Sequence, residues 1–445
     1  MKYVLANIKK LYDGKSNHED SVHRDVDVVI DKGQIDQLIL DPSKKKYSKD
    51  FQIVDCKNLF VTPGLVDCHS HITIVGLESE DVIRTNSPAG LLYCEKILYQ
   101  TLVYGGVTSI REIGGATNFI KRMVDEGVMI GPRMKIAIAI LSTTGGHLDF
   151  CGPDRCHGDI SPLFKAGPGR PSSLVDGPWE CRKRVRELKA CGADFVKLCT
   201  SPGVASPNDE LEHEDLSREE IDAICDEAAK RGMKVAAHAH SKHGIKMAIE
   251  GGVRDIQHIS YMDDELASLA HKRGCVVTPT SWVIDEFSQI SKLPSAVRDK
   301  IDQVGEHHAN AVRAAHQNGL KILAGTDAFL PGMHGRNYLE LGSLHNKGVD
   351  ALSVWHGATG LAADEIGLSQ TGQISAGHTA DLLVLKNDVI DNPNKFESDS
   401  ILEVFKDGLS HKNYFEGLPK NDFDTINRHF LAMEKAETFG VKLPR

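Results

Sequence analysis

Residues 59–71 read Leu-Phe-Val-Thr-Pro-Gly-Leu-Val-Asp-Cys-His-Ser-His, an apolar run that ends in two histidines, His69 and His71. A run of this kind is typical of a buried β-strand. Side chains alternate between the two faces of a strand, so histidines two residues apart point the same way. Two converging imidazoles can bind a metal ion such as zinc, which favours nitrogen ligands. Because a chain with 21 histidines also contains this spacing by chance, the interpretation depends on further ligands.

Outward from this stretch, strand-like runs alternate with segments long enough for a helix. Eight runs cover residues 60–69, 107–111, 134–141, 194–199, 234–239, 254–259, 275–280 and 321–326. Glycines end several of the helical patterns, as left-handed C-caps require, and Ser217 with Glu220 predicts a capping box. Eight β/α units predict an α/β fold, a distorted TIM (β/α)8 barrel. A doubly wound open sheet is the alternative, but no Gly-x-Gly-x-x-Gly loop follows an early strand.

Both ends of the chain have a different pattern, with short β segments separated by turn signals. Such segments recur in residues 1–58 and again in residues 368–420. We expect the two ends to pair into one small β-sandwich domain, beside a barrel domain formed by residues 59–367. Residues 421–445 are predicted to form a C-terminal helix and tail.

Composition and charge exclude two classes of partner. The net charge of −10 and the isoelectric point near 6.1 argue against nucleic-acid binding, which needs a basic patch. The longest apolar runs are much shorter than a membrane span, and the N-terminus lacks the apolar segment of a secretory signal. Ten cysteines without paired spacing favour a reducing compartment. The sequence therefore predicts a cytoplasmic protein that binds neither nucleic acid nor membrane.

Polar residues at the strand ends supply the further ligands, because the active site of a TIM barrel lies at the C-terminal ends of its strands. Four such residues lie near the ends of the fifth, sixth and eighth runs, namely His238, His240, His258 and Asp327, and Lys197 lies inside the apolar frame of the fourth run. Each type has a structural alternative: a histidine can be hydrogen-bonded in the core, an aspartate can cap the next helix, and a lysine can extend to solvent. Burial of Lys197 in an apolar strand is costly without a partner or a chemical modification. Together with the two histidines of the first run, the set is hard to assign to chance.

On these residues the chain resembles the amidohydrolase superfamily, metal-dependent hydrolases built on a distorted TIM barrel. The resemblance covers nearly the whole chain and rests on residues 62–71, 196–198, 237–240, 257–258 and 324–327. Residues 377–385 resemble that group's return to the β domain. Within the superfamily, the chain is similar to the imidazolonepropionase-related branch, which includes Xaa-Pro and other dipeptidases and ochratoxinase-type amidases.

The resemblance implies a centre of two divalent metal ions. It implies that His69, His71 and Asp327 bind the more buried ion and that His238 and His258 bind the second. Zinc is the first choice for a mixed set of imidazole and carboxylate ligands, with manganese or cobalt as alternatives.

The resemblance also implies how the centre works. Lys197 would carry an N6-carboxylate, a carbamate that bridges both ions, which removes the cost of burying it. A metal-bridging hydroxide would attack the substrate, since a bound divalent ion lowers the pKa of water to about 7. Asp327 would accept its proton and pass it to the leaving nitrogen, as a positioned carboxylate can.

Three further residues are candidates for substrate binding. The loop at 142–147 reads Ser-Thr-Thr-Gly-Gly-His and resembles the Gly-Gly-His loop of the dipeptidase-like branch, so we assign His147 to carbonyl or carboxylate binding. Its alternative is a solvent-facing histidine. His240 lies on the same face as His238 and either contacts substrate or packs in the core. Arg111 at the end of the second run could clamp a substrate carboxylate, or form a salt bridge with Glu112 or Asp149.

The sequence thus predicts a binuclear amidohydrolase that cleaves a small-molecule amide, a dipeptide or an N-acyl amino acid. One alternative is a cyclic-amide hydrolase or a deaminase on the same scaffold, although mononuclear deaminases usually lack a bridging lysine. Another is a non-catalytic barrel that acts as a scaffold. The exposed β domain offers a contact surface for a homo-oligomer.

Overall fold

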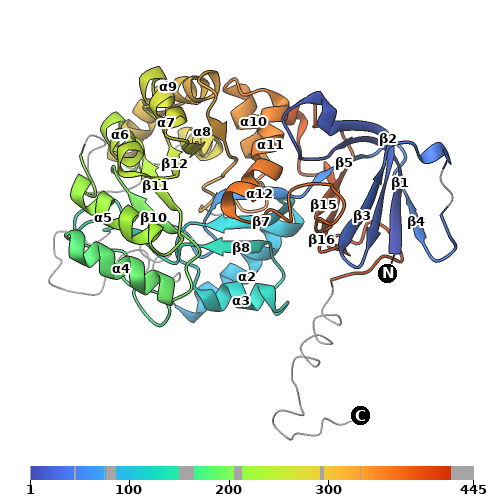
Figure 1. The fold of residues 1–445 in the computed structure, drawn as a ribbon, viewed down its shortest axis with the longest axis horizontal. Coiled ribbons are helices and arrows are strands. Elements are labelled where there is room, and N and C mark those ends of the chain that lie inside the picture. The colour runs from blue at the N-terminus through green and yellow to red at the C-terminus, as the bar shows by residue number, and fades with distance from the viewer. Residues whose placement is uncertain are drawn as a thin grey trace, which may run out of the picture.

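The fold is that of a computed structural model, which describes residues 2–44, 47–74, 76, 87–149, 165–204, 213–290, 295–330 and 332–421. It is an α/β structure in which a barrel surrounded by helices adjoins a smaller β-sheet domain (Figure 1). The predicted helix and tail at residues 421–445 lie, except for Asn421, outside the described residues.

Strands from both ends of the chain form one sheet of eight strands, in the order β17-β16-β15-β5-β1-β2-β3 with β4 paired to β1. These strands are β1 (Lys2–Tyr12), β2 (Val22–Asp31), β3 (Gln34–Ile39), β4 (Gln52–Asp55), β5 (Phe60–Pro63), β15 (Leu382–Leu385), β16 (Ile401–Lys406) and β17 (Leu409–Ser410). β5 pairs with β1 and β15, although its residues fall in the run predicted as the first barrel strand. That run is two strands, divided at Gly64, where a Cβ would overlap the side chain of Thr108.

The barrel consists of parallel strands in two hydrogen-bonded groups, β6-β7-β8 and β9 to β14. They are β6 (Leu65–Ser70), β7 (Val107–Glu112), β8 (Arg133–Ile136), β9 (Ile140–Leu141), β10 (Val196–Cys199), β11 (Val235–Ala239), β12 (Asp255–His258), β13 (Val276–Thr278) and β14 (Lys321–Ile322). Backbone hydrogen bonds join the two groups at both edges, from Asp194 N to Ile136 O at 2.8 Å and from Cys68 N to Ala324 O at 2.9 Å. The predicted TIM-barrel fold is therefore confirmed.

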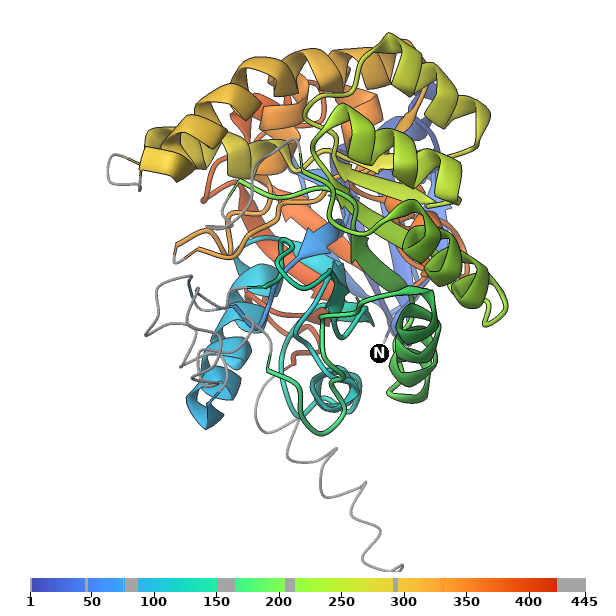
Figure 2. The same ribbon diagram turned by 90° about the vertical axis from the view of Figure 1, so that its left-hand side faces the viewer.

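Helices surround the strands, as the end-on view in Figure 2 shows. They are α2 (Pro88–Val103), α3 (Asn118–Asp125), α4 (Pro178–Ala190), α5 (Arg218–Ala229), α6 (Lys242–Gly251), α7 (Asp264–Lys272), α8 (Ser281–Gln289), α9 (Ser295–Gln317), α10 (Leu339–Asn346), α11 (Ala351–Gly357) and α12 (Gly360–Ile366). The predicted capping box begins α5, where the Ser217 hydroxyl accepts from Glu220 N. Gly252 ends α6 with a φ of 92°, in the left-handed conformation expected of a glycine cap.

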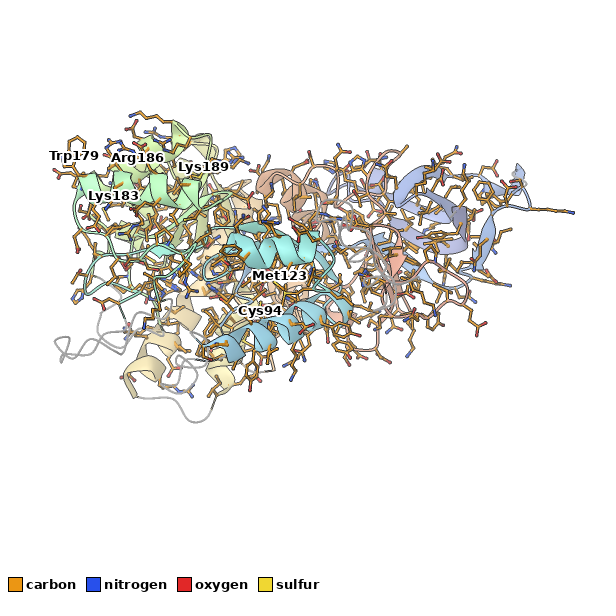
Figure 3. The ribbon with its side chains drawn as sticks, turned by 90° about the horizontal axis from the view of Figure 1, so that it is seen from below. Cys94, Met123, Trp179, Lys183, Arg186 and Lys189 are labelled. Atoms are coloured by element: carbon orange, nitrogen blue, oxygen red, sulfur yellow. The ribbon has the colours of Figure 1, made fainter. Side chains whose placement is uncertain are left out.

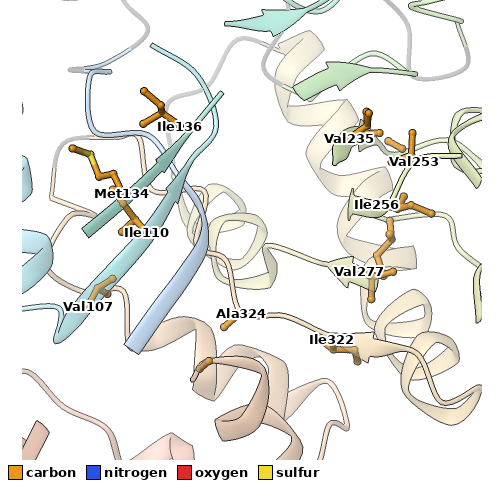
Figure 4. Packing of buried hydrophobic residues seen from close by; sticks show 14 of the residues in the cluster. Val107, Ile110, Met134, Ile136, Val235, Val253, Ile256, Val277, Ile322 and Ala324 are labelled. Carbon is orange, nitrogen blue, oxygen red and sulfur yellow. The ribbon is translucent and has the colours of Figure 1, made fainter. Parts of the chain in front are cut away.

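The main apolar core lies between the strands and the helices, and Figure 4 shows part of it around β7, β8 and β11 to β14. It follows from alternation along each strand. In β11, for example, Val235 and Ala237 belong to this core, whereas His238 lines the barrel interior. Such a strand thus packs one face against the helices, and its other face points into the barrel interior, where the site lies.

The outer face of α4 is mostly charged, and Figure 3 shows Lys183, Arg186 and Lys189 on it beside Trp179, which is 81% exposed.

None of the helices in the described ranges has the length and apolar character that crossing a bilayer requires.

Candidate metal centre

One cavity at the C-terminal ends of the barrel strands collects the predicted residues. It has a volume of about 750 Å³, and we call it the mouth cavity. Eight of the nine predicted site residues line it: His69, His71, His147, Lys197, His238, His240, His258 and Asp327. Residues more than 250 positions apart in the sequence therefore meet at one place.

Strand alternation explains why these side chains point inward. In β10, Val196 and Leu198 pack in the core between strands and helices, whereas Lys197 and Cys199 line the mouth cavity. Neighbouring parallel strands are in register, so Cys199 of β10 is level with His238 of β11. Lys197 is level with Ala236, two residues before His238, so the amine and this imidazole reach the cavity from adjacent strands at different levels.

His69, His71 and Asp327 form the first half of the centre. The Nε2 atoms of both histidines lie 3.2 Å from Asp327 Oδ1. Asp327 is held against this strand by a 2.7 Å hydrogen bond from its backbone N to His69 O. Gly325 permits the close approach, because a Cβ there would come within 2.9 Å of the His69 backbone nitrogen. The two ends of the barrel sequence thus close on a shared carboxylate.

His238, His240 and His258 form the second half. Their ring centroids lie 4.4 to 4.8 Å apart, and each side chain is at most 6% exposed. His147 stacks on His238 with centroids 4.2 Å apart. Its ring occupies space left by Gly203, where a Cβ would overlap the imidazole. The predicted loop histidine therefore faces the centre and not solvent.

Backbone strain coincides with two of the candidate ligands. His258 and Asp327 have φ angles of 69° and 51°, in the left-handed region that non-glycine residues seldom adopt. Such conformations cost about 1–3 kcal/mol each and cluster at functional sites. Both strained residues lie at strand ends that face one cavity. This indicates that the placement of their side chains in the cavity outweighs the free-energy cost of the left-handed backbone.

Lys197 is buried in the barrel interior with 1% exposure. Its Nζ donates a hydrogen bond to Gln257 Oε1, and Gln257 Nε2 donates to Asp255 at 3.1 Å. The amine therefore contacts a neutral amide and not a carboxylate. Burial lowers the pKa of Lys197 to about 7, so a substantial fraction is free amine at neutral pH, the form that reacts with CO2.

Burial also keeps the imidazoles neutral. It lowers the pKa of His69 to about 4 and that of His240 to about 3, and it holds the pKa values of His238 and His258 well below the usual range. Burial alone would raise the pKa of Asp327, but the neighbouring His69 and His71 outweigh it and hold that pKa far below the ordinary value. At neutral pH these four imidazoles are neutral and the Asp327 carboxylate is ionised.

This donor set fits divalent metal ions. Metal ligands must be deprotonated, which is the state that burial favours here. Ligand atoms of His69, His258 and Asp327 lie within 4.8 Å of one another, and the same holds for His238, His240 and His258. Among the residues that the structure describes, the buried Nδ1 atoms of His69 and His71 have no hydrogen-bond partner. Zinc, with its preference for imidazole nitrogen, suits such a set.

Arg111 is the one predicted site residue that lies elsewhere, so the prediction that it clamps a substrate carboxylate is wrong. Its Nε donates to Cys68 O at 2.8 Å, and its guanidinium pairs with Asp255. Neither of the predicted salt-bridge partners, Glu112 or Asp149, is used in that pair. Arg111 and Asp255 instead line a second cavity at the opposite end of the barrel, of about 700 Å³, which we call the floor cavity.

Sequence reasoning missed Gln257 and the apolar wall of the mouth cavity. Gln257 is two residues after Asp255 in β12, and this spacing places both side chains on one face. That signal was available beside His258. The wall is formed by Ile284 and Phe287 of α8 together with Phe329 and other apolar residues. No local pattern marks α8 as a cavity wall, because only the packing of the barrel brings it there.

Comparison with known proteins places this site in a family. The sequence model of the amidohydrolase family matches residues 60–410. Ochratoxinase of Aspergillus niger is 30% identical over 368 residues, which cover 79% of this chain and 75% of that protein. Imidazolonepropionase of Mesorhizobium japonicum is 25% identical over 361 residues, covering 75% and 79%.

Solved structures agree with this result. A Xaa-Pro dipeptidase with methionine bound in its active site superposes with a TM-score of 0.77 at 29% identity, covering 92% of this chain and 100% of that one. The crystal structure of ochratoxinase from A. niger gives a TM-score of 0.80 at 26% identity and covers 95% of this chain and 99% of that one.

Proposed function

Since this chain belongs to the amidohydrolase family and is a hydrolase acting on C–N bonds, we propose that it is a binuclear enzyme that cleaves the amide bond of a dipeptide or an N-acyl amino acid. The proposed ions are zinc. His69, His71 and Asp327 would hold the first, and His238 and His258 would hold the second. A carboxylated Lys197 would be a ligand of both.

The convergence of these six side chains on the mouth cavity is the observation that carries the proposal. Histidines alone could be core residues, but a buried lysine without a carboxylate partner is costly. Carboxylation removes that cost. The amine bonds to the carbon of CO2 and releases one proton, which leaves a carbamate anion among groups suited to cations.

The proposed ions would supply a water of pKa near 7 and polarise the scissile carbonyl. The protein supplies the proton transfer. Asp327 stays ionised at neutral pH, so it accepts the proton of the attacking water and delivers it to the leaving nitrogen. The 2.7 Å hydrogen bond from Asp327 N to His69 O keeps the residue in place for both transfers.

The rest of the mouth cavity supports an apolar acyl group or side chain in the substrate. Ile284, Phe287 and Phe329 line the cavity together with the polar groups, and burial of a methylene against such a wall contributes about 0.8 kcal/mol. His147, stacked on His238, is placed to hydrogen-bond a carbonyl or a carboxylate. Among the similar proteins, the Xaa-Pro dipeptidase is named for a dipeptide substrate and ochratoxinase for ochratoxin.

The test is a substrate screen with the zinc-loaded enzyme, purified from cells grown with added bicarbonate. Dipeptides, N-acyl amino acids, cyclic amides and aminated heterocycles form the library, and free amino acid and ammonia are measured separately. We expect hydrolysis of dipeptides or N-acyl amino acids with apolar acyl groups, loss of activity after chelation, and recovery with zinc. Ammonia release without a new amino acid would favour a deaminase, and turnover of cyclic amides alone would favour the imidazolonepropionase-like alternative.

A further inference from the structure

A chain of hydrogen bonds leads from the mouth cavity into the protein behind His240. His240 Nδ1 lies 2.8 Å from Ser260 Oγ, and the same hydroxyl lies 3.3 Å from His308 Nδ1. The other nitrogen of His308, Nε2, lies 3.0 Å from Ser281 Oγ. All four residues are at most 2% exposed. Three elements far apart in the sequence, β12 with its following loop, α8 and α9, thus meet behind one imidazole.

The number of protons available to these four side chains restricts the direction in which the hydrogen bonds can be donated. Burial holds the pKa of His308 well below the usual range, so its ring carries one N–H, and each serine carries one O–H. In one direction, Ser281 donates to His308, His308 donates to Ser260, and Ser260 donates to His240 Nδ1. In the reverse direction, His240 Nδ1 donates and the last proton lies on Ser281.

Only the first direction satisfies every donor. Ser281 Oγ has no hydrogen-bond partner other than His308 in the part of the chain that the structure describes, so the reverse direction leaves a buried O–H without an acceptor, which is unfavourable. The backbone of Ser281 is fixed at the start of α8, because Glu340 of α10 accepts hydrogen bonds from Ser281 N at 3.0 Å and Trp282 N at 2.7 Å.

We propose that Ser281, His308 and Ser260 hold His240 as the tautomer protonated on Nε2, so that His240 donates a hydrogen bond to the substrate carbonyl and does not bind metal. The inference rests on the proposed function. It separates His240 from its neighbours His238 and His258, with which it could otherwise form a three-histidine metal site. A fixed N–H aimed at the carbonyl oxygen stabilises the negative charge that develops there. His240 is then a catalytic residue, and His308 is a positioning residue.

Metal content tests whether His240 binds metal. Purified wild type and His240→Ala are loaded with zinc, dialysed and analysed for zinc by mass spectrometry. We expect the same number of ions per chain in both, with kcat reduced 10- to 100-fold in the variant. Loss of one zinc equivalent from His240→Ala would overturn the proposal. This measurement decides whether His240 is a metal ligand even if the wild type hydrolyses no amide in the library, an outcome that would count against the proposed function alone.

The relay is tested at His308, which touches neither metal ligands nor the cavity. We expect His308→Leu to lower kcat about tenfold with KM and zinc content unchanged. Leucine cannot donate to Ser260, so nothing then fixes the hydrogen bond from Ser260 to His240 Nδ1. His308→Asn should restore most of kcat, since its amide can donate to Ser260 in place of Nδ1. Ser281→Ala removes one hydroxyl and serves if His308→Leu does not fold. Equal kcat in wild type, His308→Leu and Ser281→Ala would refute the relay, as would a loss expressed only in KM.

Discussion

The two cavities of the barrel both combine apolar with titratable side chains, and they differ in which titratable groups they contain and in how the charges are arranged. In the floor cavity the ionised side chains have partners of opposite sign: Arg111 pairs with Asp255, Lys135 lies 3.6 Å from Asp194, and Arg254 lies 2.6 Å from Glu365. The mouth cavity contains imidazoles and one amine around a single carboxylate, Asp327.

This difference separates stability from function. Paired charges at the floor have little capacity left for a ligand, and the N-terminal end of a TIM barrel generally serves stability. The mouth leaves nitrogen lone pairs facing a cavity, which is costly unless cations or substrate complete the site. The arrangement of charge, more than burial itself, therefore identifies the active end.

The largest expected effect comes from removing the lysine of the mouth. Lys197→Met should lower kcat/KM on the order of 1000-fold, because the loss of a metal bridge removes several kcal/mol of transition-state stabilisation. Zinc content should fall as well. The matched control is Lys135→Met at the floor, which we expect to change kcat/KM by less than about twofold. Comparable activity losses in the two variants would erase the distinction between the cavities.

The next effect is on stability and concerns the floor. Arg111→Met leaves the Asp255 carboxylate buried without its partner, which should lower the free energy of unfolding by about 3–5 kcal/mol. Urea denaturation of the zinc-loaded protein measures it. The double variant Arg111→Met/Asp255→Asn should recover much of the loss. If Arg111→Met left stability unchanged and impaired substrate binding, Arg111 would again be a candidate for binding a substrate carboxylate.

A smaller effect follows from the pKa of Lys197, which is lowered to about 7. Only the free amine reacts with CO2, and its fraction rises as the pH rises through the pKa. At constant dissolved CO2, carboxylation of the metal-free protein should therefore be roughly tenfold faster at pH 8 than at pH 6. Incorporation of 13C-labelled carbon dioxide, followed by NMR, measures the rate, and Lys197→Met is the blank. A rate that falls with rising pH would contradict this prediction.

The smallest effect concerns the apolar wall. Val283→Thr places a hydroxyl in the mouth cavity and should lower kcat/KM for apolar acyl substrates about fivefold, or roughly 1 kcal/mol. The same replacement at Val276, which lines the floor cavity, should leave the preference among acyl groups unchanged. Steady-state kinetics with a series of acyl chain lengths distinguish the two variants. Equal changes in preference at both positions would mean that the wall does not contact substrate.

The sequence by itself determined most of the barrel and which residues reach the mouth. Period-two alternation and glycine stops are local properties, so the strand runs, the capping box at Ser217 and the inward direction of His238 could be predicted residue by residue. A strand-end position was enough for Asp327, because parallel strands share one carboxyl end, and Lys197 was marked by its place inside an apolar strand, where a lone amine is costly to bury.

Only the tertiary structure decided the depth of each side chain and its partners. Arg111 is near the end of β7, yet it meets Asp255 at the start of β12, because the strands of a barrel are staggered and equal positions along them do not share a level. His308 lies within a long helix with no local mark of function, and only packing brings it to Ser260. Local periodicity fixes which face a side chain takes, whereas its level and its partners depend on contacts between distant segments.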